Sequence, residues 1–239
     1  MLQRLQSIRP RLQLLARLDP QFHLFGASAH RYQLAPPLAE DEVATFELLH
    51  GVRLPEDYRA FLLDVGSWGA GPYGGLKALG NFEHAVELLT GVEVEPPDWC
   101  WGEGLDPNFL ASPFPHRNAF NLMNPEEQPD AQSSEEEQTA FWNLREEAVW
   151  KDNWVAGTIC LSHEGCGMLD LLIVSGEERG AIWVDDRCND GGLSPLEPNR
   201  TTSQSRSRSM FLRADSARLA FLDWYEWWLD WSLQEAKAK

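Results

Sequence analysis

The sequence has no long uninterrupted apolar run, few cysteines, and far fewer basic than acidic side chains. No segment approaches the roughly 18 consecutive apolar residues of a membrane-spanning helix, and residues 1–18 interleave arginine with leucine. We therefore expect neither a membrane span nor a signal peptide. The 239 residues include 20 Lys and Arg against 37 Asp and Glu, a formal net charge of −17. Because such a surface repels phosphate, the composition argues against a nucleic-acid-binding protein.

The chain contains only four cysteines: Cys100, Cys160, Cys166 and Cys188. Their spacing fits no zinc or redox motif, and a chain of this length buries enough surface to fold without disulfides or a structural metal. A composition of 43% hydrophobic and 24% charged residues is globular rather than disordered. We expect a soluble, reduced, cytoplasmic protein without cofactor or metal.

The N-terminal third is predicted to be helical. Residues 1–35 are basic and form a helix that Pro10 splits, with a leucine stripe that packs on the core or, alternatively, lies on a membrane surface. Residues 38–50 begin with three acids, which favour a helix N-terminus. Residues 54–66 place apolar side chains at helical spacing between a proline and a glycine, which predicts a third helix.

Most of the net charge lies in residues 93–153, which hold 14 acidic and three basic side chains. Within this segment, residues 124–138 are almost entirely polar and are expected to form a solvated loop. We interpret residues 1–239 as a single domain with an acidic insertion at about 93–153.

Strands follow the acidic segment. Residues 157–161 predict a short strand, and the nearly continuously apolar residues 168–175 predict a central buried one. A turn at 176–180 leads into an antiparallel strand at 181–184, and a polar loop occupies 185–192.

Three motifs suggest sites but have simpler explanations. The sequence at 69–74 matches GxGxxG, yet it follows a helix instead of a strand, which favours a structural turn. His163 could activate Cys166 as a nucleophile, although a cysteine between two glycines is typical of a close backbone approach. The acids of the 185–192 loop could bind a cation, but Asp in a Gly-rich loop more often caps turns.

The last helix is expected from about 215 to 234. One broad arc of this helix is apolar and predicted to face the core; it consists of Phe221, Leu222, Trp224, Tyr225, Trp228 and Leu229. Asp223, Glu226 and Asp230 lie on the opposite face, with Trp227 among them. Trp227 is either an exposed interface anchor or a residue that a neighbouring segment covers.

Several segments in the right order resemble the SUKH superfamily, the Smi/Knr cell-wall-assembly-regulator family. They are LPEDYRAFLLDVGSWGAGPYGGL (54–76), LASPFPHRNAFNL (110–122), the strand segment 157–196 with its GCG turn, and FLDWYEWWLD (221–230). The chain departs from the family pattern at Ser67-Trp68 and at Gly74, where a second Tyr is common.

The resemblance implies an α+β fold, a mixed or antiparallel central sheet flanked by helices, and no catalytic residues. It also implies an immunity protein that binds and neutralises a bacterial toxin, often a nuclease, or alternatively a regulatory scaffold without a toxin partner. A third hypothesis is an enzyme that uses His163 and Cys166. An acidic protein would be steered electrostatically to a basic nuclease cleft. The candidate partner contacts are Trp227, Asp223, Asp230, Asp185, Asp186 and Asp190.

Overall fold

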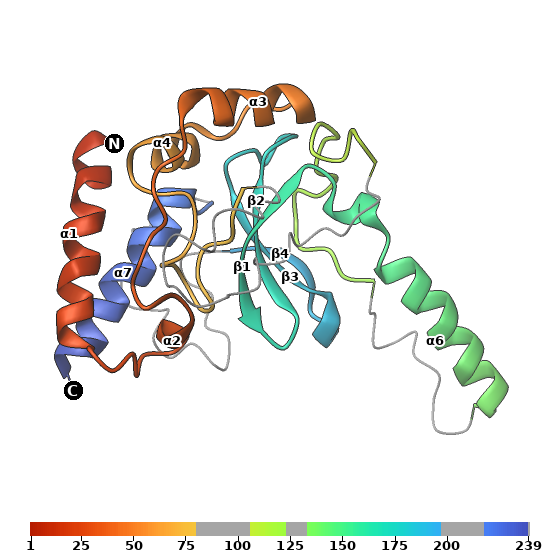
Figure 1. Ribbon diagram of the computed structural model, residues 1–239. Helices are drawn as coiled ribbons and strands as arrows, with labels where there is room; N and C mark the ends of the chain where they lie inside the picture. The colour runs from red at the N-terminus through yellow and green to blue at the C-terminus, as the bar shows by residue number, and fades with distance from the viewer. Residues whose placement is uncertain (80–105, 123–132, 197–217, 239) are drawn as a thin grey trace.

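The computed structural model describes residues 1–79, 106–122, 133–196 and 218–238 (Figure 1). A four-stranded sheet stands at the centre, helices cover one side of it, and one helix projects from the opposite side (Figure 1). The buried apolar side chains of the helices and the sheet form one continuous core. In the part of the chain described, no helix is long and apolar enough to cross a membrane.

The sheet is antiparallel throughout, in the order β1-β2-β3-β4. The strands are β1 (Thr158–Gly165), β2 (Met168–Ile173), β3 (Ile182–Asp186) and β4 (Gly192–Pro195). The central strand β2 is buried along its last four residues, as its nearly continuous apolar sequence predicts. The predicted α+β class and the antiparallel hairpin between β2 and β3 are thus confirmed.

Helices α1 (Leu2–Leu18) and α7 (Phe221–Ala238) lie side by side and run in the same direction (Figure 1). The leucine stripe of α1 faces the core, as expected for a helix of the protein surface. The prediction that Pro10 splits this helix is wrong, since α1 continues through it. Pro10 is exposed, and buried residues on both sides of it hold the helix in place.

The other N-terminal helices are α2 (Ala27–His30), α3 (Glu40–His50) and α4 (Glu56–Asp64), and the last two confirm the sequence prediction. Helix α4 packs its aromatic side chains on α7, with 4.7 Å between the ring centres of Tyr58 and Phe221 and 4.8 Å between those of Phe61 and Tyr225. The predicted apolar arc of α7 is buried in full. These contacts join the N-terminal third of the chain to its last helix.

The motif at 69–74 is a turn in which backbone segments pack directly against one another. Gly69 pairs with both Leu34 and Leu76, and a side chain on Gly69 would lie 2.4 Å from the Gln33 carbonyl oxygen. The Tyr225 hydroxyl donates a hydrogen bond of 2.7 Å to the Ala70 carbonyl. Glycine is required here by close packing of backbone on backbone, which agrees with the structural interpretation of the motif.

Helix α6 (Glu135–Val149) contradicts part of the predicted 124–138 loop. Glu135 to Gln138 form its first turn, because Ser134 and Glu137 make a reciprocal capping box. The rest of that prediction, up to residue 132, lies outside the described residues. Short 3-10 turns, η2 (Asp152–Val155) and η3 (Arg187–Asn189), complete the described elements.

Cys160 in β1 is disulfide-bonded. The expectation that all cysteines are reduced is therefore wrong for this residue. Its strand position is buried, and cysteine spacing in the sequence carries no information about which strands and loops approach one another.

Candidate protein-interaction surface

The acidic face of α7 is occupied by the basic helix α1. The Arg4 guanidinium lies 2.7 Å from an Asp223 oxygen and 2.6 Å from Glu226, and Arg11 pairs with Asp230. The side chains of Asp223 and Asp230 remain 42% and 56% exposed. The two charged segments that the sequence predicted separately therefore neutralise each other.

Trp227 is half-buried and packs against the core. This position agrees with the hypothesis that a neighbouring segment covers Trp227. An interface anchor needs an exposed ring, and Trp227 offers a partner only part of its surface.

The three aspartates of the 185–192 loop have different environments. Asp185 is buried in β3, where its carboxylate lies 2.6 Å from the Arg187 guanidinium, so a partner cannot reach it. Asp186 is half-exposed and accepts a hydrogen bond of 2.8 Å from Asn189. Asp190 is exposed and has a left-handed backbone. Among the described residues, no group of three or more His, Cys, Asp or Glu could hold a metal ion.

His163 and Cys166 lie near each other in the β1–β2 hairpin without the contacts of a catalytic pair. The His163 Nδ1 atom accepts a hydrogen bond from the Gly165 N–H, at 3.1 Å. The Cys166 carbonyl accepts one from the Cys188 thiol, also at 3.1 Å. Within the described contacts, nothing places the imidazole on the Cys166 sulfur, as activation of a thiol nucleophile requires.

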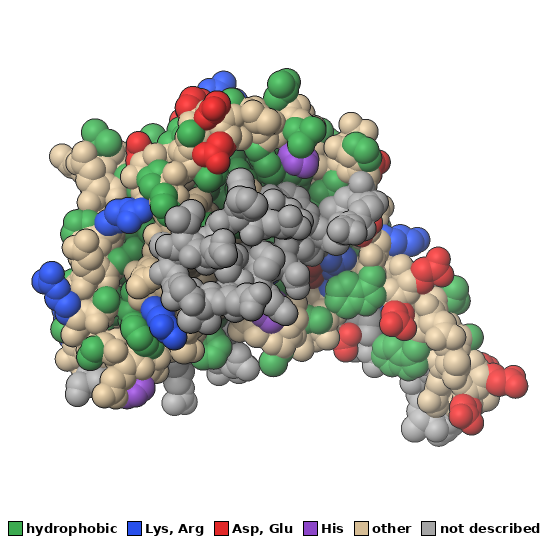
Figure 2. Space-filling view, viewed as in Figure 1, with side chains coloured by type: hydrophobic (Ala, Val, Ile, Leu, Met, Phe, Trp, Pro, Cys, Tyr) green, Lys and Arg blue, Asp and Glu red, His purple; other side chains and the backbone are tan. Residues whose placement is uncertain are grey.

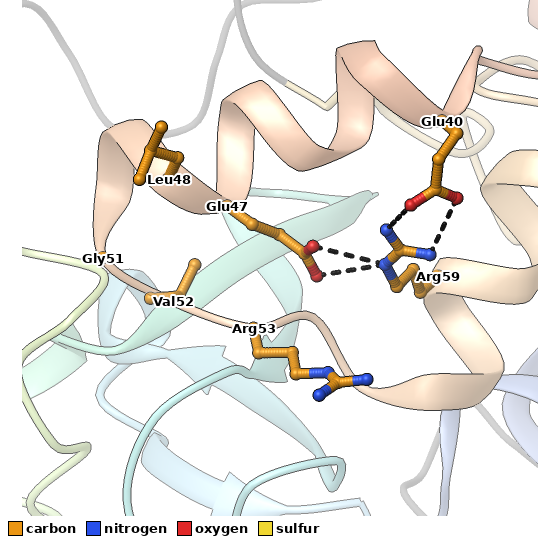
Figure 3. Close-up of a pocket in the computed structure, with 7 residues that line it drawn as sticks. All are labelled: Glu40, Glu47, Leu48, Gly51, Val52, Arg53 and Arg59. Carbon is orange, nitrogen blue, oxygen red and sulfur yellow. Dashed lines mark hydrogen bonds and ion pairs between the residues drawn. The ribbon is translucent and has the colours of Figure 1, made fainter.

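A shallow pocket lies between α3, the loop after it and α4 (Figure 3). Its carboxylates are already bound, because Glu40 and Glu47 both pair with Arg59, and Glu47 also accepts a hydrogen bond of 2.8 Å from the Leu54 N–H. These contacts tie α3 to α4. Leu48 stands at the rim and is 84% exposed.

Helix α6 exposes acidic and large apolar side chains along its length. It projects from the body beside the sheet (Figures 1 and 2). Its exposed acidic and large apolar residues, with Trp150 after its end, lie on several sides of the helix, and we call them together the acidic–aromatic face: Glu135, Glu136, Glu137, Trp142, Leu144, Glu146, Glu147 and Trp150. Trp142 is 43% exposed, Leu144 71% and Trp150 51%.

No positive charge balances this face within α6. The single basic residue of the helix, Arg145, is buried and donates a hydrogen bond to the Leu122 carbonyl. Five carboxylates are therefore presented to solvent together with three large apolar side chains. A surface of this kind suits a partner that is basic and has apolar contacts of its own.

The C-terminal end of α6 is fixed to the sheet. Arg187 donates a hydrogen bond of 2.9 Å to the Val149 carbonyl and lies 5.1 Å from the centre of the Trp150 ring. The Trp154 Nε1 atom donates to the Ala148 carbonyl at 2.8 Å. The buried Asp185–Arg187 pair thus helps to hold the end of α6 against the sheet.

Sequence reasoning missed this face because it treated residues up to 138 as loop. The capping-box pattern of Ser134 and Glu137, followed by apolar residues, is the signal that could have located the helix.

In comparisons with known proteins, a model of the SMI1 / KNR4 family (SUKH-1) matches residues 37–200, which is more than half of the chain. The matched segment includes α3, α4, α6 and the sheet, whereas α1 and α7 lie outside it. No curated protein matches the chain. No solved structure matches it either.

Proposed function

Because the chain belongs to the SMI1 / KNR4 family (SUKH-1), we propose that it is a non-enzymatic protein-binding module, an immunity protein that binds and neutralises a cognate bacterial toxin. One observation carries the proposal: α6, with Trp150 directly after it, presents five exposed glutamates, two tryptophans and a leucine, and the only basic side chain of the helix is buried. We infer that the toxin is a nuclease, because a nuclease cleft is basic where it binds phosphate.

Charge and apolar contact have different roles in this proposal. The net charge of −17 attracts a basic partner over a distance and raises the association rate. Trp142, Leu144 and Trp150 bury apolar surface on contact and slow dissociation. The glutamates then occupy the positions that nucleic-acid phosphates would take in the cleft, which blocks the substrate.

Secondary contacts come from the surfaces that the sequence suggested. Asp186 and Asp190 are accessible at the corner of the sheet, and we propose that they add to the acidic surface. Asp223 and Asp230 can contribute only if the partner replaces or shares Arg4 and Arg11, and Trp227 only through its exposed part.

The alternative is an intracellular regulatory scaffold of the same fold without a toxin partner. The observation that favours it is a second exposed apolar surface on α3, where Leu48 and Leu49 are 84% and 74% exposed. A protein with two separate docking surfaces could join two partners.

The test is an affinity pull-down from the native host with three tagged proteins. They are the wild type, an α6 variant with Trp142→Ser and Leu144→Ser, and a control with Leu48→Ser and Leu49→Ser on α3. We expect the wild type and the control to retain a toxin domain that the α6 variant loses, and coexpression with that toxin to protect cells. If only housekeeping proteins bind, and the α3 variant is the one that loses them, the scaffold function replaces the toxin hypothesis.

A further inference from the structure

Two free cysteines that are 22 positions apart in the sequence lie together at one corner of the sheet. Cys166 is in the turn between β1 and β2, and Cys188 is in η3. Both are exposed and unbonded. The Cys188 thiol donates to the Cys166 carbonyl at 3.1 Å, and its sulfur lies 2.7 Å from where a side chain on Gly167 would begin.

Asn189 fixes this arrangement. Its side-chain nitrogen lies 3.1 Å from the Cys166 carbonyl, 3.3 Å from the Cys188 sulfur and 2.8 Å from the Asp186 carboxylate, and its two hydrogens are shared among these acceptors. The turn and η3 are therefore held against each other through the two cysteines. The Cys188 sulfur is thus already at hydrogen-bond distance from the Cys166 backbone, and a disulfide between two residues needs such an approach before the bond forms.

The conformation of Cys166 is itself unusual. Gly165 and Met168 pair across the end of the hairpin, so Cys166 and Gly167 are its two turn residues, with φ of 49° and 79°. Positive φ at both positions is typical of a type I′ turn, which favours Asn-Gly. A residue kept in an unfavourable backbone conformation is a reason to look for a function of its side chain.

We propose that Cys166 and Cys188 form a reversible disulfide, which makes this corner of the sheet a site of oxidation by low-molecular-weight disulfides. The Cys166 thiolate attacks such a disulfide, RSSR, forming a mixed disulfide and releasing one thiolate. The Cys188 thiolate then attacks the Cys166 sulfur, the intramolecular S–S bond forms, and the second thiolate leaves. The protein loses two electrons and two protons, and RSSR is reduced to two RSH.

The second step depends on pH. Burial and the neighbouring Asp186 and Asp185 carboxylates raise the pKa of Cys188 above its ordinary value. Ring closure is therefore faster in alkaline solution, where more of this thiol is ionised. Once formed, the bond ties η3 to the hairpin and restrains the loop that carries Asp186 and Asp190.

The experiment treats the isolated protein with oxidised glutathione and follows its intact mass. Three proteins are compared: the wild type, Cys166→Asn, whose new residue suits the turn, and Cys188→Ser. Cys160 is already disulfide-bonded and does not compete. The wild type should lose the mass of two hydrogens and keep no glutathione. Each variant should instead gain one glutathione on its remaining thiol.

The bond should reopen with a thiol reductant, and its rate of formation should rise with pH. Circular dichroism checks that the variants are folded; if Cys188→Ser is not, Cys188→Ala replaces it. A wild type that accumulates one or two stable glutathione adducts, or whose thiols stay reduced while glutathione modifies the variants, would overturn the proposal.

Discussion

The indole Nε1 of Trp224 in α7 donates a hydrogen bond of 3.2 Å to the Asp170 carboxyl in β2. The Ser162 hydroxyl in β1 donates to the same oxygen at 2.9 Å. Asp170 is completely buried, so this carboxyl connects the last helix to two strands inside the core. Burial, together with the nearby Glu164 carboxylate, raises the pKa of Asp170 well above its ordinary value.

We predict that this raised pKa makes the protein less stable as the pH increases. The folded chain holds a proton on Asp170 at pH values where the unfolded chain, with a pKa of 3.8, has released it. The stabilisation from this proton is therefore complete below the pKa that Asp170 has in the unfolded chain. It is lost as the pH rises towards the pKa that Asp170 has in the folded chain. Asp170→Asn stays neutral and can accept the same hydrogen bonds, so urea unfolding across this pH range should show a smaller decline than the wild type.

Removing the side chain should have a different effect. Asp170→Ala leaves the N–H of Trp224 and the hydroxyl of Ser162 without their shared acceptor, at an expected cost of about 1–3 kcal/mol. If Asp170→Ala and Asp170→Asn were equally stable at neutral pH, the hydrogen bonds between α7 and the sheet at Asp170 would contribute nothing to the free energy of unfolding.

Alanine substitutions at Gly69 and at Gly180 test the close approach of backbone segments in the turn at 69–74. Both have positive φ, at 108° and 94°, so alanine is strained at either position. A side chain on Gly69 would lie 2.4 Å from the Gln33 carbonyl, whereas Gly180 has open space around it. We expect Gly69→Ala to lower the unfolding free energy by roughly 1–3 kcal/mol more than Gly180→Ala does, as measured by chemical denaturation. Equal losses of unfolding free energy would show that backbone strain at positive φ alone accounts for the effect of both substitutions.

The fold was predictable from the sequence where periodicity and turn residues agree. The apolar arc of α7, the buried strand β2 and the turn at 176–180 all depend on neighbours in the sequence and were predicted correctly. The continuation of α1 through Pro10 was not, because it depends on packing against distant residues. Local propensity describes a segment alone, while tertiary contacts can override it.

The site was less predictable, because the state of a charge depends on its spatial neighbours. Asp185, Asp223 and Asp230 looked alike in the sequence, yet the first is buried with Arg187 and the others pair with arginines of α1. The glutamates of α6 show no ion pair of this kind in the described contacts. Only the folded structure distinguishes these glutamates from the paired acidic residues of α7.

Helices α1 and α7 offer a comparison of charge and apolar packing. Arg4 and Asp223 are each about 40% exposed, so water screens their attraction, and Arg4→Gln should cost less than about 1 kcal/mol. Leu15→Ala removes a fully buried side chain and should cost about 2–5 kcal/mol. Thermal unfolding of both variants in low and high salt is the measurement. The effect of Arg4→Gln should fall in high salt, and that of Leu15→Ala should not. A larger loss from Arg4→Gln would reverse this ranking.

Binding kinetics separate the two roles assigned to α6. Neutralising Glu146 and Glu147 to glutamine should slow association with the basic partner and flatten its dependence on salt, because the steering field weakens. Trp142→Ala removes apolar contact without changing charge, so it should speed dissociation and leave association nearly unchanged. Surface plasmon resonance at several salt concentrations measures both rates. Glu56→Gln, an exposed site on α4, is the control for charge alone. If it slows association as much per charge as the α6 pair does, the attraction belongs to the whole protein and α6 is not its focus.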